Sequence, residues 1–423
     1  MNKQFQGKKL LVLAGAGVHS KVVRAAKEMG IYTIVTDYLE IKDSPAKQIA
    51  DEAWMLNITD VDGIVEKCRE AKVDGVLNFC IDPAQKPYQH ICERLQLPCI
   101  GTKEQFDILT DKRKFKDYCV AHDVDVIPEY TYEDILADRV EYPLFIKPTN
   151  SRGSRGQSIC NNKEEAFKAV ETAKAESSDN MFLCEKYMRG YQDLASAFFV
   201  VDGEPYLVKF GDRHLGLPED RMNNQVLCTE LPSSFADVFE EKVIARVKKM
   251  IKELGIQYGP VFLQGFIDGE TIRYYDPALR MPGGDYDVIL EKVTGFSTVK
   301  SLIHFALTGD TTLCIGNPEC SYRLNGGKAL LLTIAARPGK MEKVTGLEEI
   351  AQWEDVVYTR QIIEEGQVIP DSGDIRQRVA AIGAYLTDKN KKERFIDAVY
   401  ETYTIKDENH NNLVISRFEG YRN

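Results

Sequence analysis

The first hundred residues alternate short apolar runs with amphipathic segments. Residues 9–15, 32–37 and 73–79 are apolar runs of strand length. Residues 21–30 and 61–71, which lie between them, carry apolar side chains at helical spacing. Strands that alternate with helices predict a parallel sheet with right-handed crossovers, and such a sheet binds its ligands beyond the carboxyl ends of its strands.

The pattern changes after residue 108. Residues 110–140 have a mostly helical pattern up to a turn at Pro128, and strand patterns dominate residues 141–325. Two amphipathic stretches, near 163–176 and 236–254, predict helices within this strand-rich part.

The last hundred residues mix the two patterns. Residues 328–336 and 412–418 have the composition of strands, and one long helix is expected near 374–403. A smaller α+β unit is the simplest account of this part. The fold class predicted from the whole pattern is α/β and α+β, beginning with a Rossmann-like parallel sheet.

Net charge and cysteine usage narrow the class of protein. The 423 residues carry a formal net charge of -11, which argues against a general nucleic-acid or anionic-membrane partner. The 10 cysteines form no CxxC pair and stand in apolar runs, as Cys80 and Cys184 do, so we expect buried reduced thiols. The apolar run at 10–16 is too short for a signal peptide, and no run approaches the roughly 20 residues that span a bilayer. We therefore expect a cytoplasmic protein.

A glycine-rich turn follows the first predicted strand. It contains Gly15 and Gly17, Asp37 ends the next strand, and Ser20 stands in place of the third glycine of a dinucleotide fingerprint. Glycines let backbone amides approach phosphate, and the acid can hold a ribose. An NAD-dependent oxidoreductase is therefore one hypothesis. A Rossmann-like domain that serves another substrate, or structure alone, is the alternative.

A lysine and a loop of small and basic residues form a second candidate for phosphate binding. Lys147 ends a predicted strand and precedes the loop 151–156, which contains Arg152 and Arg155. A strand lysine can contact phosphates as a compact charge, and small residues let loop amides wrap them. Lys112, on a predicted helix, is a further candidate. The alternatives are a solvated loop with a snorkelling lysine and an ordinary surface-helix lysine.

The segment Glu185, Lys186, Tyr187 and Met188 follows a short apolar strand. A strand that leaves the core at such a hinge can offer backbone groups to adenine and an acid to its amino group. Asp193, just beyond, can bind ribose hydroxyls. The alternative is an ordinary edge strand.

Residues 261–284 predict a β-hairpin that carries polar side chains. Because side chains alternate between the faces of a strand, Gln264 is expected near Tyr274, with Asp276 one step further on the same face. Gln264 and Asp276 then converge, and Arg280 lies beyond them. Mg²⁺ prefers oxygen ligands and uses one or two carboxylates together with substrate phosphates. The hairpin is therefore a candidate metal site, and a core hairpin with a polar rim is the alternative.

The order and spacing of these elements resemble the ATP-grasp superfamily, in the branch of biotin carboxylase and carbamoyl-phosphate synthase. The resemblance covers most of the chain. It implies a Rossmann-like domain over residues 1–108, an ATP-grasp domain over 109–325 that clamps ATP between two α+β halves, and a smaller α+β domain over 326–423.

The resemblance also implies roles for individual residues. Asp276 and Gln264 would hold Mg²⁺ or Mn²⁺, and Arg280 and Lys147 would be the catalytic cations. The family hairpin has an acid and an asparagine where this chain has Gln264 and Ala278, and this departure argues against two bound metal ions. The residues implied to bind ATP are Lys112, Lys147, Ser151, Arg152, Gly153, Ser154, Glu185, Lys186, Met188 and Asp193.

The reaction implied by the resemblance is the ATP-dependent joining of a carboxylate to an amine or a thiol. An amino acid, small peptide or related metabolite is the expected substrate, held by Arg213, His214 and Arg280, in a chain that could form a homodimer. Two alternatives remain. One is a degenerate ATP-grasp protein that binds ATP in a regulatory role, which Gln264 and Ala278 favour. The other is the NAD-dependent oxidoreductase.

Overall fold

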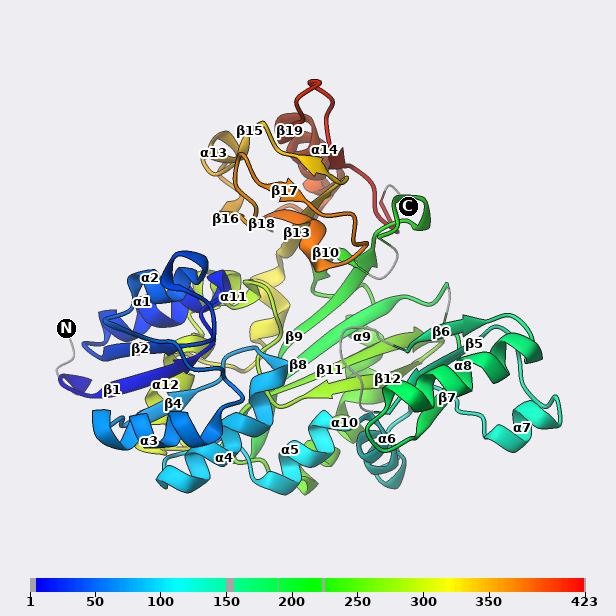
Figure 1. Ribbon diagram of the computed structural model, residues 1–423, viewed down its shortest axis with the longest axis horizontal. Coiled ribbons are helices and arrows are strands. Elements are labelled where there is room, and N and C mark those ends of the chain that lie inside the picture. The colour runs from blue at the N-terminus through cyan, green and yellow to red at the C-terminus, as the bar shows by residue number, and fades with distance from the viewer. Residues whose placement is uncertain (1–4, 150–155, 189, 223–224, 422–423) are drawn as a thin grey trace.

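The N-terminal part is a parallel sheet, as the alternating pattern predicts. The computed structural model describes residues 5–149, 156–188, 190–222 and 225–421. Its first sheet has the order β3-β2-β1-β4, and all neighbouring strands are parallel (Figure 1). The strands are β1 (Lys9–Leu13), β2 (Tyr32–Thr36), β3 (Glu52–Trp54) and β4 (Gly75–Leu77). The helices are α1 (Ser20–Glu28), α2 (Pro45–Ile49), α3 (Val61–Ala71) and α4 (Gln85–Leu95). The pattern did not reveal β3 and α2, which have only 3 and 5 residues, or α4.

Three helices lead from this sheet to a small antiparallel sheet of order β6-β5-β7. The helices are α5 (Lys103–Thr110), α6 (Lys112–Ala121) and α7 (Tyr132–Leu136), and the strands are β5 (Leu144–Pro148), β6 (Ser158–Cys160) and β7 (Phe182–Lys186). Helix α8 (Lys163–Glu176) packs on this sheet, and its predicted bounds are confirmed. Asp111 caps α6 by accepting hydrogen bonds from the amides of Arg113 and Lys114, so Lys112 stands at the first position of the helix.

A second, larger sheet has nine strands in the order β12-β11-β8-β9-β10-β13-β18-β16, with β20 paired to β13. The strands are β8 (Asp193–Val201), β9 (Glu204–Leu215), β10 (Val226–Leu231), β11 (Tyr258–Asp268), β12 (Thr271–Ala278), β13 (Lys328–Ala336), β16 (Val356–Gln361), β18 (Arg378–Leu386) and β20 (Val414–Ile415). The sheet continues across residue 325, because β10 pairs with β13. The helix expected near 236–254 consists of α9 (Ala236–Val238), a π-helical turn (Phe239–Val243) and α10 (Ile244–Glu253).

The long helix expected near 374–403 is wrong in its first half. Residues 378–386 form β18, which lies between β13 and β16, and only 392–402 form a helix, α14. An apolar run that is buried on both faces has no period that separates a strand from a helix. The remaining C-terminal elements are β14 (Gly339–Lys340), β15 (Lys343–Thr345), α13 (Leu347–Ile350), β17 (Val368–Ile369) and β19 (Thr404–Lys406).

Two helices that follow the large sheet's hairpin return to the N-terminal sheet. They are α11 (Tyr286–Thr294) and α12 (Thr298–Thr308), and α12 packs against α1 and β4. One hydrophobic core therefore extends from the parallel sheet to strands β8 and β11. The approach of α12 to β4 is close: a Cβ atom at Gly75 would lie 2.4 Å from the carbonyl oxygen of Ala306.

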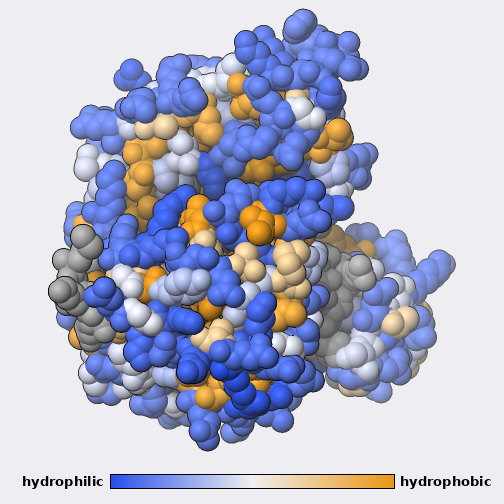
Figure 2. All heavy atoms as spheres, turned by 60° about the vertical axis from the view of Figure 1, so that its left-hand side comes forward, coloured by the Kyte–Doolittle hydropathy of each residue, from blue (hydrophilic) through white to orange (hydrophobic). Residues whose placement is uncertain are grey.

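The thiols and the surface agree with the sequence-based expectation where they can be examined. All 10 cysteines are free and seven of them are buried. The face in Figure 2 is largely hydrophilic, with apolar side chains in small groups. Across the described ranges, we find no helix whose length and apolar character would let it cross a bilayer.

Substitution of Gly75 tests this packing. We expect Gly75→Ala to lower stability by about 1–3 kcal/mol, because the new methyl group must displace the backbone of α12. Gly283→Ala is the matched control, since its Cβ would meet no atom within 4 Å. Thermal unfolding followed by circular dichroism gives the comparison, and equal melting temperatures for the two variants would contradict the close approach.

Candidate active site

The β11–β12 hairpin contains a bulge that the sequence pattern did not reveal. Gln264 pairs with Asp276 and Gly265 pairs with Tyr274, so Tyr275 is an extra residue on β12. The expected register, with Gln264 near Tyr274, is wrong by two residues. One comes from this bulge, and the other comes from the short turn, since Asp268 pairs with Thr271. The two oxygen-bearing side chains nevertheless converge, because Gln264 and Asp276 lie directly opposite each other.

Two cross-strand rows form one face of the large sheet, which we call the site floor. The first row is Lys209, Ala197, Phe262 and Ala278, and the second is Gly211, Ala195, Gln264 and Asp276. Residues directly opposite one another project from the same face of a sheet. Since half of these eight residues are glycine or alanine, the long side chains at the edges of the floor can lie across it.

Arg213 lies at one edge of the site floor and organises the polar groups there. Its Nη1 donates hydrogen bonds to Gln264 Oε1 (2.8 Å) and Tyr275 Oη (3.0 Å), and lies 3.2 Å from Asp193 Oδ1. Tyr275 also donates to Gln264 Oε1, at 3.0 Å. Burial raises the pKa of Asp193 to about 6, and the positive charge of Arg213 opposes this rise. The guanidinium is thus held by three oxygen atoms from three strands.

The structure corrects two residues of the expected set. His214, next to Arg213 on β9, projects from the opposite face of the strand, where it lies 3.2 Å from Glu230 and packs on Phe418. It does not join Arg213 at the site floor. Asp193, expected at the ribose, is buried beside Arg213 and Tyr275.

The residues of the hairpin fit one divalent cation rather than two. Asp276 has a partly exposed carboxylate that lies 3.4 Å from Lys112 Nζ. The carbonyl oxygen of Gln264 already accepts hydrogen bonds from Arg213 and Tyr275. No cluster of three histidine, cysteine, aspartate or glutamate side chains with metal-binding geometry occurs among the residues that the structure describes. One carboxylate together with substrate phosphates is a set of ligands that suits Mg²⁺.

A buried carboxylate holds two lysines below the nucleotide side of the site. Glu185 on β7 lies 2.6 Å from Lys116 Nζ on α6 and 2.6 Å from Lys147 Nζ on β5. All three side chains are at most 4% exposed. Burial opposes ionisation of the carboxyl, but the two ammonium groups outweigh it and lower the pKa of Glu185. Lys147 is therefore a fixed cation, not the solvated lysine of the alternative interpretation.

The hinge differs from the expectation in one respect. The Glu185 carboxylate points to the lysines, so it is not available for an adenine amino group. The backbone of the hinge is anchored, because the amide of Lys186 donates to Pro128 O and that of Tyr187 to Pro143 O. Met188 is buried and the Lys186 side chain is half-exposed. The predicted loop residues Ser151, Arg152, Gly153 and Ser154 lie outside the described residues.

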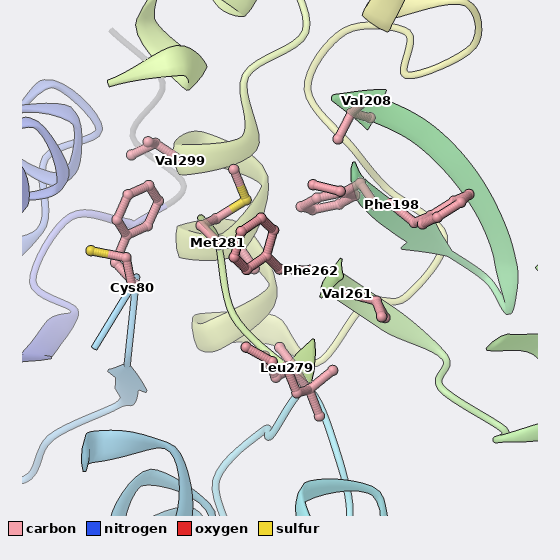
Figure 3. Close-up of a cluster of buried hydrophobic side chains, with 14 of the residues drawn as sticks. Cys80, Phe198, Val208, Val261, Phe262, Leu279, Met281 and Val299 are labelled. Carbon is pink, nitrogen blue, oxygen red and sulfur yellow. The ribbon is translucent and has the colours of Figure 1, made fainter. Parts of the chain in front are cut away.

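Arg280 follows β12 and is fixed by its neighbours in the chain. Leu279 and Met281 are buried in the apolar cluster of Figure 3, which joins Cys80 of the N-terminal part to Phe262 of the site floor. The guanidinium lies 5.5 Å from the centre of the Phe262 ring. It pairs through two nitrogens with Asp82, at 2.5 and 2.8 Å. Arg280 thus faces the site floor across the carboxyl edge of the parallel sheet.

The glycine-rich turn after β1 does not leave its acid free. The Asp37 carboxylate accepts hydrogen bonds from the amide of Gly15 (2.9 Å) and the hydroxyl of Ser44 (2.8 Å), and lies 2.7 Å from Lys47. A carboxylate with these three partners has a structural role in the turn. This observation argues against the NAD-dependent alternative.

Several residues of the site were not found from the sequence. Lys116 is four residues from Lys112, so both lie on one face of α6, and this spacing could have revealed it. Tyr275 joined the cluster only because of the bulge. Asp82, the partner of Arg280, is 198 residues away in sequence, and no local pattern could pair the two.

Comparison with known proteins agrees with this geometry. Residues 111–275 match the family described as carbamoyl-phosphate synthase L chain, ATP binding domain. A 2-oxoglutarate carboxylase small subunit from Hydrogenobacter thermophilus is 26% identical over 323 residues, which cover 71% of this chain and 66% of that protein. The chain spans less than two thirds of the length of the first curated relatives it matches.

Solved structures share the fold over nearly the whole chain. The biotin carboxylase domain of the H. thermophilus enzyme, in complex with MgADP, ADP and bicarbonate, has a TM-score of 0.76 at 21% identity and covers 96% of this chain and 91% of its own. An L-amino acid ligase from Bacillus licheniformis has a TM-score of 0.75 at 18% identity and covers 95% and 99%. At these identities the likeness establishes the fold.

The buried triad of Lys116, Glu185 and Lys147 yields a stability prediction. Glu185→Gln leaves the buried Lys147 ammonium without its counter-charge and Lys116 with the Glu129 carboxylate alone, so we expect a loss of about 3–5 kcal/mol at pH 7. Because the pKa of Glu185 is lowered by folding, this contribution is present above the ordinary glutamate pKa of about 4.3 and is lost as pH falls below it.

Glu129→Gln is the control, since Glu129 is 25% exposed and also pairs with Lys116; a loss below about 1 kcal/mol is expected there. Urea unfolding at pH 7 and pH 4 measures both variants. A Glu185→Gln protein as stable as the Glu129→Gln protein would show that the triad is not the anchor of Lys147.

Proposed function

We propose that this chain, a member of the ATP-grasp superfamily in its carbamoyl-phosphate-synthase and biotin-carboxylase branch, is an ATP-dependent ligase that joins a carboxylate to an amine or a thiol. The observation that carries the proposal is the pair of cations at Lys147 and Lys112. One is fixed by a buried carboxylate and the other faces Asp276. These two cations would face the phosphates of a nucleotide held between the proposed hinge and the proposed metal-binding hairpin.

The chain's own residues supply charge and position. Lys147 and Lys112 would neutralise phosphate oxygens, and Asp276 would hold Mg²⁺ or Mn²⁺. When bound, Mg·ATP supplies the phosphoryl group that activates the substrate carboxylate. The Glu185 carboxylate keeps the Lys147 ammonium in place before the nucleotide arrives, so little reorganisation is needed.

Arg280 is the residue best suited to grip the substrate carboxylate. Its planar fork already binds one carboxylate, that of Asp82, through two nitrogens. The Asp82 side chain is 61% exposed, whereas that of Arg280 is 9% exposed. Because Asp82 can turn toward solvent, a substrate carboxylate can take its place on Arg280.

The cellular compartment proposed for the reaction follows from the free thiols and the acidic chain. All ten cysteines are unbridged, which suits a reducing, cytoplasmic environment. Amino acids, small peptides and related metabolites are the substrates proposed. A homodimer remains a prediction, and light scattering after size-exclusion chromatography tests it.

A regulatory ATP-binding protein is the second candidate, favoured by Gln264 and Ala278 at the metal site. Phosphate release from Mg·ATP in pools of amino acids, dipeptides and small carboxylates separates the two functions. We expect pool-dependent release that falls by about 100-fold or more in Lys147→Ala, because one preorganised charge is lost. Lys168→Ala is the matched control, since this lysine is 75% exposed on α8. ATP binding without release in any pool would favour the regulatory protein.

The position of Arg213 leads to a prediction about how many metal ions the site binds. In Gln264→Glu the new carboxylate would pair with the Arg213 guanidinium that now bonds the glutamine, so we expect one Mn²⁺ per chain in both proteins with ATP bound. Electron paramagnetic resonance titration of free Mn²⁺ measures the stoichiometry. A second ion bound by Gln264→Glu, with faster turnover, would contradict the view that Arg213 occupies the place of a second cation.

A further inference from the structure

Lys209 is a buried lysine that pairs with no carboxylate among the described residues. It lies on β9, on the same face as Gly211 and Arg213, and is 4% exposed. Within the described part of the chain its ammonium forms no ion pair and no hydrogen bond. Its Nζ atom lies 5.5 Å from the centre of the Tyr286 ring. The Tyr286 hydroxyl donates to the carbonyl of Val208, so the ring is fixed beside the lysine.

The other cations near Lys209 are all compensated. Arg213 pairs with Asp193 and Arg280 pairs with Asp82. The third, Lys21 of α1, lies 3.0 Å from Asp285 and also contacts Asp287 at the start of α11. Asp285 in turn pairs with Arg360 of β16. Lys209 is therefore the excess positive charge of this group.

The charged groups that face Lys209 come from four segments: Arg213 on its own strand, Asp287 on α11, Lys21 on α1, and Arg280 after β12. Burial is the main cause that lowers the pKa of Lys209 to about 7, and Arg213, Lys21 and Arg280 add to it, while Asp287 opposes it. A buried charge without a partner is costly. An anion that enters beside it removes this cost.

The site floor sets the distance between Lys209 and Arg280. Lys209 pairs with Ala197, which pairs with Phe262, and Arg280 lies over the Phe262 ring. Two strand spacings, about 10 Å, therefore separate the strand of Lys209 from that of Phe262. The intervening residue of this row, Ala197, has only a methyl side chain and is buried. A ligand that spans this distance can meet Arg280 at one end and Lys209 at the other.

We infer that Lys209 binds a second anionic group of the substrate whose reacting carboxylate lies at Arg280, so that the substrate is a dicarboxylate. This inference rests on the proposed function for the reacting end alone. Lys209 determines which acid is accepted, and it takes no part in phosphoryl transfer. The substrate class narrows from carboxylates in general to short dicarboxylic acids, including the dicarboxylic amino acids.

The test measures binding without turnover. Isothermal titration calorimetry of the full chain, with and without MgADP, compares succinate, glutarate, L-aspartate and L-glutamate with propionate, butyrate and L-alanine. We expect at least one dicarboxylate to bind about tenfold or more tightly than its monocarboxylate match, because it gains a charge-assisted contact. Lys209→Met should abolish this difference, and Lys209→Arg should retain part of it.

Proton uptake provides a second readout. At pH 8 a lysine of lowered pKa is mostly neutral, and a bound anion raises its pKa, so binding should take up close to one proton in the wild type. Titration in phosphate and Tris buffers, which have different ionisation enthalpies, measures it. Lys209→Met should take up none. Without ligand, the Lys209→Met protein should have a melting temperature about 2 °C above that of the wild type, since an unpaired buried charge is removed.

Two outcomes with the wild type would overturn the inference: no dicarboxylate binds, or dicarboxylates bind no better than monocarboxylates. Two outcomes with Lys209→Met would also overturn it. The variant could keep the preference for dicarboxylates, or it could lose turnover without any change in binding, as expected if Lys209 were a proton acceptor. Failure of the ligase proposal has a different signature. In that case no phosphate is released from Mg·ATP, while the binding preference for dicarboxylates and its loss in Lys209→Met remain.

Discussion

The Glu185 carboxylate, buried between Lys116 and Lys147, is the interaction on which this part of the candidate site depends. It joins α6 to β5 and β7. Burial lowers the pKa of Lys147, and the charge of the Glu185 carboxylate opposes this fall. The carboxylate also fixes the position of the Lys147 side chain. The cost of desolvating three charges is met by short ion pairs and by the hydrogen bond from Lys116 to Ile127 O.

The same arrangement recurs across the molecule: a cation presented to the site has a carboxylate behind it. Asp193 stands behind Arg213, Asp82 beside Arg280, and Asp276 beside Lys112. Each cation is thereby held in place by its partner. An acidic chain, of net charge -11, can in this way hold individual cations at fixed positions. Lys209 departs from the arrangement, which is why its position is informative.

The sequence predicted the elements with a clear period and missed those without one. The parallel sheet, α3 and α8 follow from alternation and helical spacing, and the roles of Lys147, Asp276 and Arg280 stay predictions from their places at strand ends. The β18 strand was taken for a helix because burial on both faces removes the period. The Tyr275 bulge shifts the hairpin register, and bulges leave no mark in an alternating pattern. His214 could not be separated from Arg213 without knowing which face of β9 is covered. The pairs Arg280–Asp82 and Lys147–Glu185 join distant segments, and only the fold brings them together.

The nine-stranded sheet has a consequence for how the chain can be divided. Residues 326–423 supply β13, β18, β16 and β20 to the sheet that begins with the site floor. If these residues were removed, β10 would become an exposed edge strand with the backbone groups of Cys228 to Leu231 unpaired. Open edges of this kind recruit strands from other molecules. The C-terminal segment is thus a lateral cap on the large sheet, and a protein trimmed at residue 325 would be prone to self-association through that edge.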